Sequence, residues 1–191
     1  MARYRKSRVK IIRRLGKLPG FTTKTTKRVS NTNLKRLSQY SLHLREKQKL
    51  RYNYGVTENE LIKYVTLSRK RKGNTGSVLL ELLEMRLDTI IYRSGITKTI
   101  VEARQLVNHG HVFVNNVKVT IPGYSCSISD KIILKTSLIE ESQKELENNI
   151  SHLLVNNNNN ILTITITNNP NISILGFTIN VLLVLEYYSG K

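Results

Sequence analysis

The sequence predicts an α+β fold, in which a mainly helical body carries an inserted small module that combines a helix-turn-helix with a β-hairpin and strands. Apolar side chains recur at helical spacing, behind helix-capping signals, from residue 42 to residue 108. Short β-rich runs separated by turn residues follow from residue 111 onward. With 191 residues, of which 39% are hydrophobic, the chain can bury one or two ordinary cores.

Four helices are expected in the first part of this pattern, in residues 42–54, 57–68, 77–94 and 99–108. The first is rich in good helix formers and stops at Gly55, a natural C-terminal cap. The third has a continuous apolar stripe of leucine and isoleucine. This stripe indicates a helix that faces a core.

Capping boxes mark where two of these helices begin. Thr57 with Glu60, and Thr99 with Glu102, have the spacing at which a hydroxyl and a carboxylate satisfy orphan backbone amides. Between them, residues 69–76 form a basic loop that contains two glycines and separates two helices.

The strands expected next are residues 111–114, 117–119 and 130–134. Asn115 and Asn116 separate the first two, and asparagine tolerates the positive φ that a two-residue hairpin turn requires.

The last part of the chain changes in character. Residues 140–153 resemble an acidic helix, and residues 156–160 are an uninterrupted asparagine run, interpreted as a variable insertion. Leu162, Ile164 and Ile166 alternate with threonine and predict a strand. These features divide the chain into four parts: a basic arm (1–41), a helical body (42–85), a small module (86–150) and a C-terminal segment (151–191) that is expected to pack back on the body and carries the Asn-rich insertion.

Positive charge is the strongest functional signal. Lysine and arginine total 31 against 13 acids, so the formal net charge is +18, and residues 1–51 contain a single acid, Glu46. Such an excess indicates a polyanionic partner, either nucleic acid or an anionic membrane surface. No apolar run reaches 18 residues, and the best candidate, 174–185, is interrupted by polar residues and glycine, so a membrane span is rejected.

The basic arm has few core-forming residues and is expected to become ordered on its partner. An organellar transit peptide is the competing interpretation, because such peptides are also basic and poor in acids. The basic character continues through residues 35–51, into the expected helix, which favours the arm.

Nothing in the residues indicates catalysis, a metal site or a cofactor. Cys126 is the single cysteine, which excludes a disulfide framework and a cysteine zinc site within the chain, and we expect it to pack as a small hydrophobe.

The expected RNA-binding residues share a cationic or hydrogen-bonding side chain and lie in the arm, the first helix, the basic loop and the module. They are Arg3, Arg5, Lys6, Arg8, Lys10, Arg13, Arg14, Lys17, Lys47, Lys49, Arg51, Arg69, Lys70, Arg71, Lys72, Lys98, Arg104, Gln105, His109, His111, Asn115 and Lys118.

For three of them a structural role is equally open: His109 as a helix cap, Asn115 as the turn residue and Gln105 as a solvated side chain. Arg86 and Asp88 are expected to form a structural pair. Tyr52, Tyr54 and Tyr64 are expected to pack between helices, with Tyr52 as the candidate exception that stacks on a base.

Several stretches resemble the family of the fourth protein of the small ribosomal subunit, in its plastid form. They are Arg-Tyr-Arg at 3–5, Ile-Arg-Arg-Leu-Gly at 12–16, Leu-Pro-Gly at 18–20, Glu-Lys-Gln-Lys-Leu-Arg at 46–51, Met-Arg-Leu-Asp at 85–88, Ala-Arg-Gln-Leu-Val-Asn-His-Gly-His at 103–111 and Glu-Tyr-Tyr-Ser at 186–189. They occur in the family's order over nearly the whole chain. The cysteine cluster that binds zinc in some bacterial members is absent, as in plastid members.

The resemblance implies a structural constituent of the small ribosomal subunit, not an enzyme, located in the plastid stroma within the ribosome. It implies a primary rRNA-binding protein that nucleates assembly of the subunit body at a multi-helix junction. It also implies contact with small-subunit protein five near the mRNA entry path, with an influence on translational accuracy. Because the match begins at Met1, no transit peptide is expected.

Two other functions share some of these sequence features. Similar modules are attached to rRNA-modifying enzymes, but too little chain follows residue 150 for a separate catalytic domain. A helix-turn-helix DNA-binding protein is suggested by residues 77–108, although the second helix carries few base-reading side chains.

Overall fold

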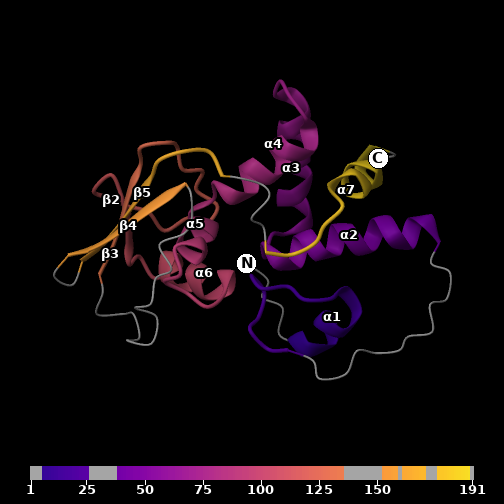
Figure 1. The fold of residues 1–191 in the computed structure, drawn as a ribbon, viewed down its shortest axis with the longest axis horizontal. Helices are drawn as coiled ribbons and strands as arrows, with labels where there is room; N and C mark the ends of the chain where they lie inside the picture. The colour runs from indigo at the N-terminus through magenta and orange to yellow at the C-terminus, as the bar shows by residue number, and fades with distance from the viewer. Residues whose placement is uncertain (1–5, 26–37, 136–151, 159–160, 171–175, 190–191) are drawn as a thin grey trace.

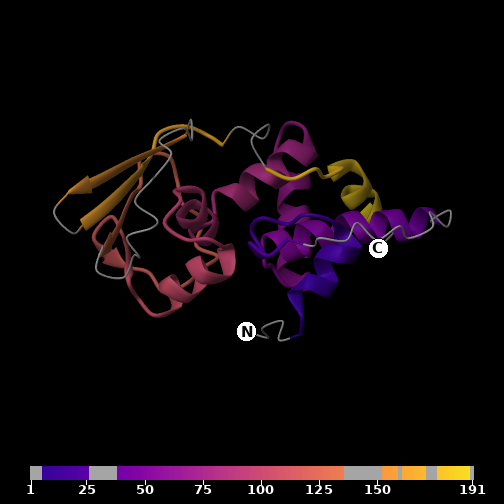
Figure 2. The same ribbon diagram turned by 60° about the horizontal axis from the view of Figure 1, so that its bottom comes forward.

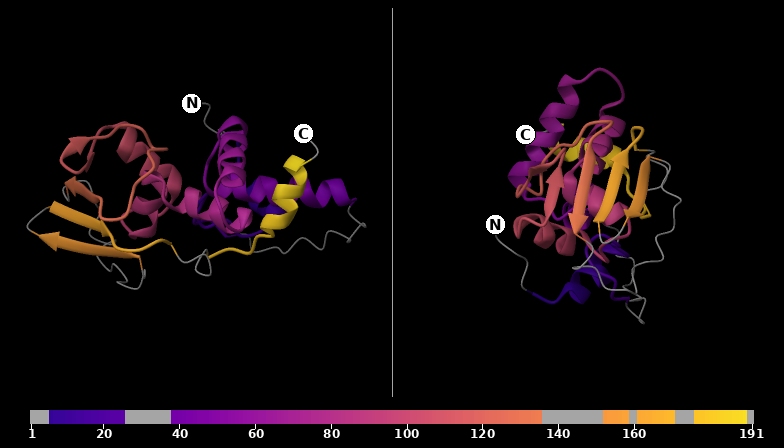
Figure 3. Two further views of the ribbon diagram at one scale, coloured as in Figure 1. Left: turned by 90° about the horizontal axis from the view of Figure 1, so that it is seen from above. Right: turned by 90° about the vertical axis from the view of Figure 1, so that its left-hand side faces the viewer.

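The computed structural model describes residues 6–25, 38–135, 152–158, 161–170 and 176–189. A helical body and a module with a β-sheet lie next to each other, so that the sheet and helix α2 are at opposite ends of the molecule (Figures 1 and 3). The body contains α1 (Arg8–Leu15), α2 (Gln39–Asn53), α3 (Glu58–Lys70), α4 (Thr75–Glu84) and α7 (Val181–Ser189). The module contains α5 (Leu87–Arg93), α6 (Ile100–Asn108), β1 (Val112–Val114), β2 (Val117–Lys118), β3 (Lys131–Lys135), β4 (Leu153–Asn158) and β5 (Ile161–Ile166). The α+β prediction is confirmed.

The body core forms where α2, α3, α4 and α7 meet. Leu50, Leu61, Leu79 and Leu83 have no exposed surface, and Val184 of α7 is equally buried among them. Helix α7 therefore completes a core formed by helices that lie far before it in the sequence. At the start of α3 the expected capping box is present with both of its hydrogen bonds.

One expected helix, residues 77–94, is two helices that meet at Met85 and Arg86. Arg86 has the extended backbone of an N-cap, with φ −76° and ψ 143°. The backbone groups freed by the break bond to the loop before β3: Leu87 N donates to Tyr124 O over 2.9 Å, and Cys126 N donates to Met85 O over 2.9 Å. The apolar stripe continues across the break, which is why the sequence alone predicts one helix.

The module packs α5 and α6 on one face of an antiparallel sheet with the strand order β2-β1-β3-β5-β4 (Figure 1). Inward side chains from β1, β3 and β5 face the helices, and Val112, Ile132 and Ile164 have no exposed surface. The hairpin turn has φ of 49° at Asn115 and 67° at Asn116, as the two asparagines predict.

Strands β4 and β5 extend the module's sheet, whereas the sequence assigns residues 151–191 to a segment on the body. Ile164 of β5 lies opposite Ile132 of β3, and Val155 of β4 lies opposite Ile164. The alternating apolar face of β5 is buried against α5 and α6 by this pairing, which gives the physical reason for its position. Within the asparagine run, residues 156–158 belong to β4 and 159–160 lie outside the described residues. The helix expected at 140–153 lies almost wholly outside them, and β4 begins at Leu153.

The N-terminal segment, residues 6–25, packs beside α2 (Figure 2). Leu15, Leu18 and Phe21 form a small buried cluster, with Tyr52 packed against it. The arm is too poor in apolar residues to order alone, and the sequence predicts that it becomes ordered on its partner. In the structure the body already supplies apolar surface to residues 6–25. Residues 26–37 lie outside the described part. Among the described residues, no helix is both long and apolar enough to cross a membrane.

Candidate RNA-binding surface

The N-terminal segment exposes most of its cations. Lys6 precedes α1, and Lys10, Arg13, Arg14 and Lys17 project from α1 and the turn after it. The apolar residues of the same helix, Ile12 and Leu15, face the body, and this amphipathic spacing directs the cations to solvent.

Arg8 differs from its neighbours because it has partners inside the protein. Its Nη1 donates to Phe21 O over 3.2 Å, and its guanidinium lies 5.4 Å from the centre of the Phe21 ring. Arg3 and Arg5 lie outside the described residues.

The turn between α3 and α4 carries a second group of exposed cations, at the tip of a helical hairpin that projects from the body (Figure 1). Four consecutive residues, Arg69 to Lys72, are exposed there. Cations are favourable at this position because the negative end of the α3 dipole lies among them.

Lys47, in contrast, is buried. Its side chain is 6% exposed, and its Nζ lies 2.9 Å and 3.0 Å from the two carboxylate oxygens of Glu58. The Tyr187 ring lies 4.5 Å from the same nitrogen. Burial raises the pKa of Glu58, but hydrogen bonds from Lys47 and Tyr188 outweigh it and lower the pKa overall. The structure thus gives this expected RNA contact an internal role, as the cation that joins three helices.

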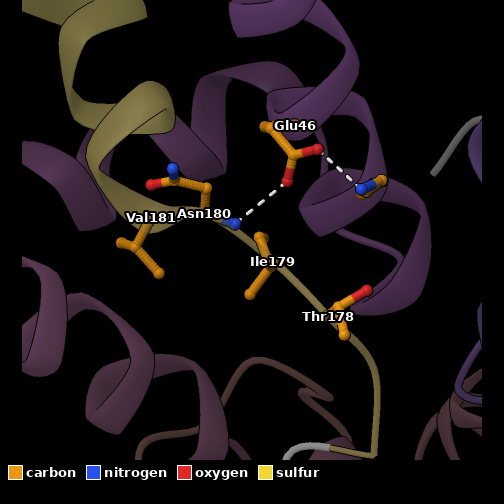
Figure 4. A pocket seen from close by; sticks show the side chains of 6 residues that line it. Glu46, Thr178, Ile179, Asn180 and Val181 are labelled. Atoms are coloured by element: carbon orange, nitrogen blue, oxygen red, sulfur yellow. Dashed lines mark hydrogen bonds and ion pairs between the residues drawn. The ribbon is translucent and has the colours of Figure 1, made fainter.

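Lys49 and Arg51 also have internal partners. Lys49 Nζ donates to Glu46 Oε1 over 2.6 Å, and the other oxygen of Glu46 accepts from the backbone N–H of Asn180 (Figure 4). The Arg51 guanidinium lies 5.7 Å from the centre of the Tyr52 ring. Glu46 thereby holds the segment before α7 against α2.

A buried charge cluster joins the module to the body. Arg86 Nε and Nη2 donate to the two oxygens of Asp88 over 3.0 Å and 2.8 Å, which confirms the expected pair. Arg104 Nε lies 3.0 Å from Asp88 Oδ2, and its Nη1 donates to Gly55 O at the α2–α3 turn. Burial would lower the pKa of Arg86, but the Asp88 carboxylate outweighs it and raises the pKa. Arg104 is an expected RNA-binding residue, but its side chain is only 13% exposed and belongs to this buried charge cluster.

The end of α6 and the hairpin expose polar groups side by side. Gln105, His109 and Lys118 are exposed, His111 is half-buried, and the two histidine rings lie 6.0 Å apart. The Lys118 side chain passes directly over Gly110, whose φ is 75°. Lys98, before α6, is exposed as well.

Asn115 shapes the turn. Its Nδ2 donates to Asp130 Oδ1 over 2.8 Å, and its Oδ1 accepts from Lys131 N over 3.0 Å. Of the two roles left open for Asn115, these bonds favour the structural one.

The distribution of acids completes the electrostatics. Of the acidic residues that the structure describes, only Glu186 is exposed, and the rest are half-buried or buried. Exposed cations missed by the sequence analysis are Lys24, Arg45, Lys63 and Lys131. These four residues lie in no recognisable motif. Only the high net positive charge of the chain indicates that further cations are exposed. The solvent-facing surface of the described part is therefore strongly cationic.

Comparisons with known proteins agree with this surface and this fold. A model of the ribosomal protein S4/S9 N-terminal domain matches residues 3–84, and a model of the S4 domain matches residues 85–132. The chain is 58% identical over 195 residues to small ribosomal subunit protein uS4c of Bigelowiella natans, with all of both chains covered. The chain belongs to the ribosomal protein S4 family. Proteins of the same name from Chara vulgaris and Ostreococcus tauri are 48% identical over 207 and 199 residues, and all of each chain is again covered.

The border between the two matched domains falls at the break between α4 and α5. The S4 domain match ends inside β3, so strands β4 and β5 complete its sheet from beyond the match. The Asp88 cluster lies just inside the S4 domain and bonds to Gly55 in the N-terminal domain. The two matched domains are thus connected by a buried cluster of charged side chains.

The tyrosines considered for base stacking, Tyr54 and Tyr64, and the single cysteine have partners or neighbours inside the fold. Tyr54 has no exposed surface, and its hydroxyl donates to Glu84 Oε1 over 2.5 Å. Tyr64 accepts from Arg86 Nη1 over 2.7 Å. Burial raises the pKa of the Cys126 thiol to about 12, so it stays protonated and unreactive at neutral pH. Among the described residues, no group of three or more His, Cys, Asp or Glu side chains is placed to hold a metal ion.

Proposed function

We propose that this member of the ribosomal protein S4 family is a structural constituent of the small ribosomal subunit and binds its rRNA. The observation that carries the proposal is the surface: exposed cations on α1, the α3–α4 turn and the S4 domain, with almost no exposed acid in the described part. Phosphate neutralisation at many separated points supplies affinity for a folded RNA. The names of the relatives support the same assignment.

The proposed RNA contacts fall into two groups. Cations of the N-terminal segment and the basic loop neutralise phosphates, and they are Arg3, Arg5, Lys6, Lys10, Arg13, Arg14, Lys17, Arg69, Lys70, Arg71 and Lys72. Polar and cationic groups of the S4 domain read RNA shape through phosphates and 2′-hydroxyls, and they are Lys98, Gln105, His109, His111 and Lys118. The side chains with internal partners support RNA binding by holding these surfaces in place: Arg8, Lys47, Lys49, Arg51, Arg104 and Asn115.

The wider role follows the family resemblance. The protein binds rRNA early, at a multi-helix junction, and nucleates assembly of the subunit body. It contacts small-subunit protein five near the mRNA entry path and influences translational accuracy. It acts without catalysis, in ribosomes of the plastid stroma, which the relatives named uS4c support.

A salt titration with two competing nucleic acids tests the proposal. For about eight phosphate contacts, log affinity for rRNA should fall with log salt with a slope near −6, at roughly 0.7 per contact. A folded multi-helix rRNA junction should outcompete duplex DNA of equal charge, by a margin that grows with salt, because shape-dependent contacts are not screened. Equal affinity for both at every salt concentration would mean a nonspecific polycation, and preference for the duplex would point to a DNA-binding protein.

A further inference from the structure

A cavity of about 440 Å³ lies where the N-terminal segment meets the S4 domain. Its lining comes from the end of α1 and the turn that follows, on one side, and from Tyr92 and Lys98 on the other. Both sides belong to described residues, and they are separated by more than 65 residues in sequence. The cavity is therefore a product of the way the two domains meet.

Two chemically different kinds of residue line the cavity. Lys17, Lys24 and Lys98 bring three cations to it, Thr22 and its neighbours add hydroxyls, and no acidic residue lines it. Pro19 and Tyr92 are among its apolar lining residues, and Tyr92 is half-buried because it also packs against both hydrophobic cores. A cavity lined by both cations and an aromatic residue matches a nucleotide, which has a phosphate and a flat, largely apolar base.

The wall of the cavity is held in place before any ligand binds. Gly20 N donates to Asn53 Oδ1 over 3.0 Å, and Gly20 O accepts from Ile100 N over 2.9 Å. Leu18, which also lines the cavity, is 1% exposed. Thr22 N donates to Leu18 O over 3.2 Å, and Lys24 N donates to Thr22 Oγ1 over 3.2 Å. These bonds fix the turn that carries Lys17 and Lys24, so a ligand binds with little cost in ordering.

We propose that this cavity holds one unstacked nucleotide of the bound RNA, with its base against Tyr92 and Pro19 and its phosphates on Lys17, Lys24 and Lys98. Sequence-specific proteins hold single-stranded RNA bases in this way, on aromatic rings next to cations. The inference rests on the proposed function and adds a specific subsite to it. It gives the interface between the two domains a direct role in RNA recognition, beyond the neutralisation of phosphates.

Photocrosslinking of the full chain bound to small-subunit rRNA tests the contact itself. Irradiation at short wavelength joins bases to side chains in direct contact, and mass spectrometry locates the adduct. We expect a nucleotide adduct on Tyr92. Tyr40 is the control because it is 63% exposed, lies at the start of α2 and does not line the cavity. An adduct on Tyr40 without one on Tyr92 would overturn the proposal.

A pair of matched double variants tests the energetics. Lys17→Gln with Lys24→Gln should weaken rRNA binding roughly tenfold or more, reduce the salt slope by about 1.4, and abolish the Tyr92 adduct. Arg45→Gln with Lys63→Gln removes the same charge from exposed positions outside the cavity and should keep the adduct. Equal effects of the two pairs, with the adduct retained in both, would refute the nucleotide site. A native chain that does not bind rRNA at all would instead refute the proposed function.

Adenosine monophosphate added to the RNA-free chain separates an RNA nucleotide from a free one. We expect weak, millimolar binding that rRNA displaces, because an isolated nucleotide makes only part of the contacts. Micromolar binding of this nucleotide without competition by rRNA would assign the cavity to a free ligand and overturn the RNA assignment.

Discussion

Asp88 has no exposed surface and lies between the guanidinium groups of Arg86 and Arg104. A buried carboxylate is costly unless cations and hydrogen bonds satisfy it, and two arginines do so here. Arg104 additionally reaches Gly55 O, so its single side chain connects α6, the start of α5 and the α2–α3 turn. Arg104 belongs to the stretch 103–111, whose resemblance to the family suggests RNA binding. Its contacts in the structure are with Asp88 and Gly55, so its role there is structural.

Arg104→Ala should therefore lower the free energy of unfolding by about 1–3 kcal/mol, because it removes a charge-assisted contact to Asp88 and the hydrogen bond to Gly55 O. Urea denaturation followed by circular dichroism measures this change. Gln105→Ala, exposed on the same helix, should stay within about 0.5 kcal/mol of the native chain. Unchanged stability of Arg104→Ala with much weaker rRNA binding would show that Arg104 contacts RNA.

Asp88→Asn should have a larger effect, with a loss of about 3–5 kcal/mol, because it leaves the buried Arg86 charge without a carboxylate. The same urea experiment measures it. Glu81→Gln on α4, where the side chain is half-exposed, is the control and should change stability little. If Asp88→Asn lowered the free energy of unfolding no more than the control does, the charge cluster would not stabilise the contact between the two domains.

At the scale of elements, Glu58 holds α7 on the body. It stands at the start of α3, accepts from Lys47 of α2 over 2.9 Å and accepts from the Tyr188 hydroxyl of α7 over 2.8 Å. Most of the packing between α7 and its neighbours is apolar, with Val184 fully buried. The Glu58 carboxylate makes this contact more specific, because its hydrogen bond holds the Tyr188 side chain against the start of α3.

This contact predicts a pH dependence. The folded pKa of Glu58 lies below the ordinary value of 4.5, so its stabilising contribution is complete above pH 4.5 and is lost as pH falls through the folded pKa. Stability measured between pH 7 and pH 3 should fall less steeply in Glu58→Gln than in the native chain, and Glu58→Gln should be less stable at pH 7. Identical acid profiles for the two proteins would show that Glu58 is not a source of the acid sensitivity.

At the scale of the whole molecule, the N-terminal segment links the two domains. Gly20 bonds to Asn53 of the body and to Ile100 of the S4 domain, and no side chain fits between them. A Cβ on Gly20 would lie 2.6 Å from Asn53 O and 2.7 Å from Ile100 Cδ1. The strongly basic segment is thus fixed at Gly20, directly after Pro19, which lines the cavity.

Gly20→Ala should release this segment without unfolding the body. Amide exchange in residues 9–22 should be slow in the free native chain and much faster in the variant, while exchange in α3 and α4 remains slow. The affinity for rRNA should fall because the segment must then be ordered on binding. Thr23→Ala, exposed in the same segment, is the control. Fast exchange in residues 9–22 of the native chain would show that the segment becomes ordered only on RNA.

Local patterns in the sequence determined the features that depend on neighbouring residues. The capping box of Thr57 and Glu60, the hairpin turn at Asn115 and Asn116, and the alternation of β5 were all predictable, because each is signalled by residue types within a few positions of one another. At the N-cap of α6 Thr99 accepts from Glu102 N as expected, although the Glu102 carboxylate bonds to Lys98 N rather than to the cap. Net charge likewise predicted the kind of partner.

Only the tertiary structure decided which cations face the solvent and which strands share a sheet. Lys47 and Lys17 belong to equally basic stretches, yet Lys47 is bound to Glu58 across two helices and Lys17 lines an open cavity. The break at Arg86 and the position of β5 depend on residues 122–126 and on β3, which lie far away in the chain. The physical reason is the same in each case: burial and pairing are set by contacts between distant segments, and composition and periodicity carry no information about which segments meet.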